Sequence, residues 1–144
     1  MNAVAAFVIA AGVALFAVAI LEYWVCTASG RKFFNVYNGR RPLTDDEMFD
    51  VYLTGTNLDR SIVSRIRQIF GHQLDLDSRR ILPDDDFGRI YWDLDFFELV
   101  CEVEEAFEIH LAPDELATTD GTIRNLAALV QQKLALASGP ISSS

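Results

Sequence analysis

The chain has 144 residues, enough for one small domain with an appendage. Its formal net charge of −9 is unevenly placed: residues 1–44 carry four basic side chains and one acidic one, and residues 45–144 carry the other eight basic and twenty acidic ones. A domain this acidic repels phosphate backbones, which argues against nucleic acid as a partner and favours the basic surfaces of proteins.

The chain opens with an apolar run over residues 3–21, which Tyr23 and Trp24 extend to about the 20 residues that cross a bilayer. No Lys or Arg precedes the run, whereas Arg31 and Lys32 follow it. This charge placement predicts a single-pass transmembrane helix over residues 1–26, with the N-terminus outside and the C-terminal domain in the cytoplasm. A cleaved signal peptide and a helix buried in a soluble core remain as alternatives.

Residues 27–43 contain Gly30, an Asn38–Gly39 pair and Pro42, and we expect a juxtamembrane linker there. Its basic residues can approach anionic headgroups. Several apolar side chains in this stretch fit either the membrane interface or the surface of the following domain, and the sequence does not choose between the two. They are Phe33, Phe34, Val36 and Tyr37.

Residues 44–56 predict a short helical extension. Thr44 and Glu47 have the spacing of a capping box, so we expect a helix over residues 45–53 that ends before Gly55. The first main helix then starts after Asn57 or Asp59 and runs to about residue 72. Its inward side chains recur at three- and four-residue spacing. They are Ile62, Ile66, Ile69 and Phe70.

The loop that follows has apolar anchors at Leu74 and Leu76, a helix-blocking Pro83, and Phe87 as the expected core contact. The acidic run Asp84, Asp85 and Asp86 lacks the spacing of a calcium loop, so we interpret these residues as loop and capping acids. His72, His110, Cys26 and Cys101 match no zinc motif, and we expect no metal site and no disulfide.

The second main helix starts near Asp93 or Asp95, either of which can cap it. Its predicted apolar stripe consists of Leu94, Phe97, Val100, Val103 and Phe107. On the opposite side three glutamates follow each other at helical spacing, namely Glu98, Glu102 and Glu105. Like charges one turn apart repel, so this face is either merely solvated or used for binding.

Residues 113–116 predict a short helical turn, and Thr122 precedes a last helix with Ile123, Leu126, Ala127 and Val130 facing inward. No alternating strand pattern competes with these helices. The sequence therefore predicts an all-α fold: a helical domain over residues 57–136, a disordered tail over residues 137–144, and a bundle of three or four helices preceded by the transmembrane helix.

This layout resembles the acyl carrier proteins over residues 59–134. The acidic loop 84–87, the second-helix sequence over residues 94–109 and the start of the last helix at residues 122–126 carry the resemblance. In that family a serine at the start of the second helix holds the phosphopantetheine arm. The corresponding residue here is Asp93, whose carboxylate cannot form that phosphodiester, and Ser61, Ser64 and Ser78 do not lie at that helix start.

Asp93 is therefore expected to act as a helix cap, with no cofactor attached. The resemblance and the acidic helix together predict a non-catalytic, membrane-anchored, carrier-like interaction module. Its partner would be a basic surface on a cytoplasmic or membrane protein, which the resemblance places in lipid or polyketide metabolism. The predicted binding residues are Asp95, Glu98, Cys101, Glu102 and Glu105.

Two further functions remain open. One is a working acyl or peptidyl carrier with phosphopantetheine attached at an unrecognised position. The other is a structural subunit of a membrane complex, in which the apolar helix with Gly12 would pack against neighbouring helices. No catalytic constellation is visible in the sequence, so an enzyme is not expected.

Overall fold

The computed structural model describes residues 3–90 and 94–139 of the chain. Its helices, in chain order, are α1 (Ala3–Asn38), α2 (Asp45–Tyr52), α3 (Arg60–Gln73), the 3₁₀ turn η1 (Ser78–Arg80), α4 (Phe87–Ile90), α5 (Leu94–Phe107), α6 (Pro113–Ala117) and α7 (Ile123–Ala137). Within these two ranges no strand is formed, and an isolated antiparallel bridge joins Asp86 to Thr122. The predicted all-α fold class is confirmed.

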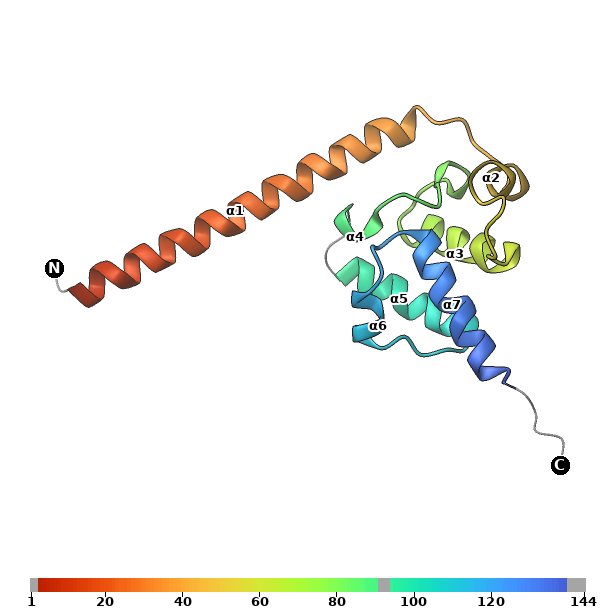
Figure 1. Cartoon of the computed structure of the whole chain (residues 1–144). Helices are drawn as coiled ribbons and strands as arrows, with labels where there is room; N and C mark the ends of the chain where they lie inside the picture. The colour runs from red at the N-terminus through yellow and green to blue at the C-terminus, as the bar shows by residue number, and fades with distance from the viewer. Residues whose placement is uncertain (1–2, 91–93, 140–144) are drawn as a thin grey trace.

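Helix α1 extends from the domain as one long arm (Figure 1). Its stretch Ala11–Asn38 is long and apolar enough to cross a membrane, judged by length and composition. The helix does not stop at residue 26 as expected, because Gly30 alone does not break it; it ends only at the Asn38–Gly39 pair. The predicted linker over residues 27–43 is therefore helical for most of its length.

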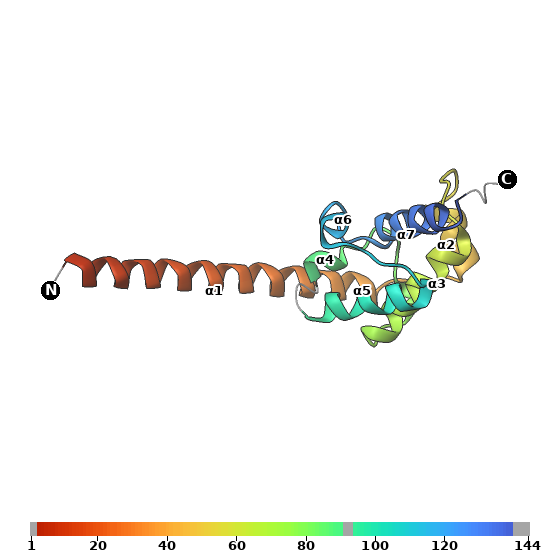
Figure 2. The same ribbon diagram turned by 90° about the horizontal axis from the view of Figure 1, so that it is seen from below.

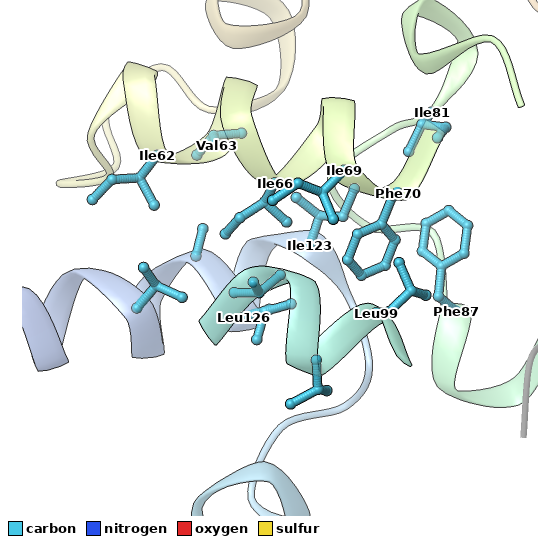
Figure 3. Packing of buried hydrophobic residues seen from close by; sticks show 14 of the residues in the cluster. Ile62, Val63, Ile66, Ile69, Phe70, Ile81, Phe87, Leu99, Ile123 and Leu126 are labelled. Carbon is cyan, nitrogen blue, oxygen red and sulfur yellow. The ribbon is translucent and has the colours of Figure 1, made fainter. Parts of the chain in front are cut away.

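The core lies between α3, α5 and α7, and α3 contacts both of the other helices (Figure 3). Helix α3 contributes one continuous apolar face, in which Val63 and Ile66 are fully buried. The Phe70 ring meets the ring of Phe87 edge to face, with 4.9 Å between their centroids. The four residues predicted to face inward from α7 are all buried: Ile123, Leu126, Ala127 and Val130.

Local capping signals set the start of three helices as predicted. Thr44 Oγ1 accepts a hydrogen bond from the Glu47 N–H at 3.2 Å, and the Glu47 carboxylate accepts one from the Thr44 N–H at 2.9 Å. Asp59, rather than Asn57, caps α3 by accepting from the Ser61 N–H at 2.8 Å. Thr122 caps α7. Such caps are worth about 1 kcal/mol each, and their short range makes them visible in the sequence.

The loop between α3 and α4 is held against the core by its apolar residues. Leu74 and Leu76 pack against the core as expected, and Phe87 is fully buried. Two side chains of α1 reach the same region, because Phe33 packs on the core and Tyr37 belongs to it. The structure thus places these two aromatic residues on the domain, which the sequence left open.

Arg67 is the largest buried polar side chain, with 1% of its surface exposed. Its guanidinium donates to the carbonyl oxygens of Ile81 at 3.0 Å and Leu43 at 3.1 Å, and to the Asp45 carboxylate at 2.7 Å. Burial tends to raise the pKa of Asp45, but hydrogen bonds from Ser64 and Arg67 outweigh it and leave that pKa below its usual value. This cluster joins α2, α3 and the loop before α4.

Candidate functional site

Four of the five predicted binding residues of α5 lie together on its solvent side. Glu98, Cys101, Glu102 and Glu105 are all exposed, and with Gln73 and Phe97 they line one shallow surface hollow. The backbone of Asp95 belongs to α5, but its side chain lies outside the described part of the structure. We refer to Glu98, Glu102 and Glu105 as the acidic ridge.

The ridge follows from helical periodicity. Leu99, Val100 and Val103 are buried against the core on the opposite side of α5. A helix turns by about 100° per residue, so positions 98, 102 and 105 fall together on the face away from these three. The sequence pattern therefore located the ridge correctly, and α5 itself contains no Lys or Arg that would neutralise it.

One member of the predicted apolar stripe was placed wrongly. Phe97 is 67% exposed, whereas Phe96 is half-buried and packs against the core. Phe96 is aligned with Val100, Val103 and Phe107 at spacings of four, seven and eleven residues, and Phe97 lies about 100° around the helix from that line. Phe97 therefore sits at the border between the apolar face and the acidic ridge.

A groove of about 760 Å³ opens beside α5 and reaches α6 and the loop before α7. Its apolar lining comes from Phe96, Phe97, Val100, Leu111, Pro113 and Leu116, and its polar rim from Asp86, Glu104, His110, Thr119 and Asp120. The side chains of Phe96 and Phe97 both line this open groove. Its shape and lining suit an apolar chain or an apolar side chain.

Two glycines that line the groove approach each other closely. Gly121 has a φ of 78°, and a Cβ atom at this position would lie 2.6 Å from the Gly88 nitrogen. The Phe87 N–H also donates to the Gly121 carbonyl at 3.2 Å, which fixes α4 against the start of α7. The sequence offered no signal for this contact, because the two glycines are far apart along the chain.

Glu104 serves the fold and is not part of the ridge. Its carboxylate accepts a hydrogen bond from the Leu111 N–H at 2.6 Å and lies 2.9 Å from His110 Nδ1. It therefore fixes the loop between α5 and α6. His110 is exposed, as is His72.

The three aspartates before α4 lie where loop and capping acids were expected. Asp84 pairs with Arg124 at 2.6 Å, and this guanidinium holds the pKa of the Asp84 carboxyl below its usual value. Asp85 pairs with Arg40 at 2.6 Å. Asp86 lies at the rim of the groove. Across the described ranges, no three metal-ligating side chains come together in a way that would hold an ion.

The position predicted to replace the attachment serine, Asp93, lies outside the described residues. The described serines have local roles: Ser61 bonds to Asp59 at the start of α3, and Ser64 bonds to Asp45. Ser78 lies in η1, where its Cβ approaches Gly71 closely. These three serines lie on α3 and η1 and not on α5.

Comparison with known families agrees with this arrangement. Residues 64–130 match the family described as phosphopantetheine attachment site. The matched region runs from α3 through the acidic helix α5 to α7 and includes the groove and the ridge. No solved structure matches the chain. The match and the helical architecture together support an acyl-carrier-like domain over residues 64–130.

Proposed function

We propose that this protein is a membrane-anchored, non-catalytic, acyl-carrier-like module that docks a basic partner surface through α5. Helix α1 would span the membrane, with the domain on the cytoplasmic side, because Arg31 and Lys32 follow the apolar stretch. The partner would be a cytoplasmic or membrane protein, and the carrier-like domain favours one that handles acyl chains in lipid or polyketide metabolism.

The supporting observation is the state of the ridge carboxylates. Many acidic side chains elsewhere in the domain are paired with basic ones: Asp45 with Arg67, Asp46 and Asp50 with Arg60, Asp77 with Arg79, Asp84 with Arg124, Asp85 with Arg40, and Glu115 with Lys133. Within the described part of the chain, no ion pair engages Glu98, Glu102 or Glu105. These three charges remain available to a partner.

Charged ridges of this kind act mainly on encounter rate and specificity. Three carboxylates one turn apart also repel each other slightly within the free protein. A basic groove on a partner would relieve that repulsion, and Cys101 beside the charges would supply apolar contact area. The same arrangement makes binding sensitive to salt, because exposed charges are screened within about 10 Å at 0.1 M ionic strength.

The test is a pull-down from detergent-solubilised native membranes with Glu98→Gln, Glu102→Gln and Glu105→Gln combined. The matched control combines Ala128→Lys, Gln132→Lys and Ala135→Lys, which changes the charge by the same amount at the same spacing on an exposed face of α7. We expect proteins recovered with the wild type to be retained by the control and lost by the ridge variant. Equal recovery by both variants would contradict docking through α5.

A second candidate function is that of a working carrier, which the match to the phosphopantetheine attachment family favours. It is tested by intact mass after incubation with coenzyme A and a broad-range phosphopantetheinyl transferase. We expect no mass increase, because Asp93 stands at the predicted attachment position. A gain of one phosphopantetheine would replace the docking module with a carrier, and peptide mapping would then locate the modified residue.

A further inference from the structure

The end of α1 is built into the domain by aromatic contacts. The Phe33 ring stacks on Tyr37 with 5.7 Å between centroids and meets Phe87 edge to face at the same separation. The Tyr37 hydroxyl accepts a hydrogen bond from the Asp77 N–H at 2.6 Å and donates to the Asp77 carbonyl at 3.2 Å. Tyr37 is 6% exposed, so this part of α1 forms a wall of the core.

A polar clamp follows directly after the helix end. Arg40 makes two hydrogen bonds to the Asp85 carboxylate, at 2.6 and 2.7 Å, and the Asp85 side chain is 7% exposed. Arg40 also donates to the Arg80 carbonyl at 3.1 Å, and Arg80 donates to the Asn38 carbonyl at 2.9 Å. Separating a largely buried, two-point ion pair leaves uncompensated charge, so the junction resists bending.

The basic residues after the apolar run fall into two pairs, of which one forms ion pairs at this junction. Arg40 is engaged with Asp85, and Arg41 lies 3.3 Å from Glu47. Arg31 and Lys32 remain exposed on the face of α1 before its contact with the domain. Helix α1 and the domain are thus joined as one stiff unit, in which the direction of the arm determines which end of the domain faces the membrane.

Figures 1 and 2 both show which end of the domain faces the membrane-spanning part of α1. The start of α5, α4 and α6 lie at the end of the domain that reaches back along α1 toward its N-terminus (Figures 1 and 2). Helix α2 and the last turn of α7 lie at the opposite end (Figure 2). Trp24 precedes Phe33, where contact with the core begins, by nine residues, which is about 13 Å along a helix. The domain therefore begins close to the expected membrane interface.

The membrane-side end exposes a large aromatic side chain. Phe97 lies in the first turns of α5 and is 67% exposed at the edge of the groove. We infer that this end of the domain is a second membrane-contacting surface, in which Phe97 enters the headgroup layer of the bilayer that α1 spans. The inference rests on the membrane anchoring proposed above. Transfer of an exposed aromatic ring from water into that boundary layer lowers the free energy of the protein.

The charges of the two parts define the kind of lipid surface. The domain is strongly acidic, so a layer of anionic lipid would repel it, whereas zwitterionic headgroups would not. Arg31 and Lys32 on α1 offset this repulsion next to the contact. The surface therefore fits a phosphatidylcholine-like layer. The acidic ridge starts at this contact and extends away from it along α5, which leaves it accessible to a partner beside the module.

Quenching of tryptophan fluorescence by lipids with brominated acyl chains tests the contact. The full chain is reconstituted in phosphatidylcholine nanodiscs with Trp24→Phe and Trp92→Phe, and one reporter is added. Phe97→Trp reports on the proposed contact. Leu136→Trp is the control, because Leu136 is similarly exposed, at 72%, near the end of α7 on the far side of the domain. We expect brominated lipid to quench the first reporter and to leave the second unchanged.

Retaining Trp24 in a chain without other tryptophans separates this inference from membrane anchoring. Quenched Trp24 with an unquenched Phe97→Trp reporter would overturn the contact, leave the anchor intact and assign Phe97 to a protein partner. If neither is quenched, both the anchor and the contact are wrong.

Loosening the junction provides the second arm. Phe33→Ala combined with Tyr37→Ala in the Phe97→Trp chain is expected to lower the quenching toward the level of the Leu136→Trp control, with helicity by circular dichroism as the check on folding. If that chain does not fold, Asp85→Asn replaces it, because it removes one partner of the clamp and keeps the aromatic packing. Quenching that survives a loosened junction would show that the arm does not orient the domain.

Discussion

Two groups of carboxylates in this domain differ in their surroundings more than in their chemistry. Asp45, Asp84 and Asp85 each face an arginine and connect segments far apart in the sequence. The acidic ridge on α5 faces solvent and has no basic neighbour on its own helix. The net charge of −9 therefore combines carboxylates that are paired with arginine and carboxylates that face solvent. One part of it holds the fold together, and we propose that the solvent-facing part on α5 serves recognition.

The largest effect on stability should come from removing Arg67, the buried partner of the Asp45 carboxylate. Arg67→Ala removes the donor to Asp45, Leu43 and Ile81 and leaves two carbonyl oxygens without that partner. We expect the free energy of unfolding to fall by about 3 kcal/mol, measured by chemical denaturation. Arg65→Ala, on an exposed position of the same helix, is the control and should change it by less than about 0.5 kcal/mol.

The clamp between α1 and the domain comes next. Asp85→Asn keeps the side-chain size but removes the charge that Arg40 contacts twice and weakens the acceptor for the Leu82 N–H. We expect a loss of about 2 kcal/mol in the free energy of unfolding. Asp114→Asn, at an exposed site in α6, is the comparison. Equal stability of the two variants would mean that the clamp does not hold the arm.

Acid should act on the paired carboxylates. The pKa values of Asp45 and Asp84 in the folded domain lie below their ordinary value of 3.8. Their contribution to stability is therefore complete above that value and is lost as the pH falls through the lowered folded pKa. Asp84→Asn should cost about 0.5 kcal/mol at pH 7, since the pair is partly exposed. It should also flatten the acid limb of a stability profile; an unchanged limb would speak against the Arg124 pair.

The smallest effect on stability is expected at the ridge. Combining Glu98→Gln, Glu102→Gln and Glu105→Gln removes like charges one turn apart and no described hydrogen bond or ion pair. The free energy of unfolding should stay within about 0.5 kcal/mol of the wild type or rise slightly. A loss of 2 kcal/mol or more by the same denaturation measurement would show that the ridge carboxylates stabilise the fold. It would contradict the distinction between them and the paired carboxylates.

The sequence predicted what local patterns encode. Thr44, Asp59 and Thr122 act as caps within a few residues of their donors, and the inward face of α7 follows a plain helical spacing. The location of the ridge follows from the same spacing. Phe97 was misplaced because an apolar residue beside Phe96 can belong to either edge of a stripe, and only the packing of α5 on α3 decides between them.

Contacts between residues far apart along the chain could not be predicted from the sequence. Arg40 and Asp85 are 45 residues apart, and nothing in either neighbourhood identifies the other as its partner. The continuation of α1 to Asn38 depends on the burial of Tyr37 and the packing of Phe33 against the core, which a linker interpretation does not anticipate. The groove is formed by α5, α6 and the Gly88–Gly121 contact together, so no single sequence motif predicts it.

The most direct test of the contrast measures binding and stability on the same two proteins. The ridge variant with three glutamines and the α7 control with three lysines are unfolded by denaturant and used in parallel to recover partners from native membranes. We expect both variants to remain as stable as the wild type and only the ridge variant to lose its partners. A ridge variant that is stable and recovers the same partners as the control would contradict recognition through α5.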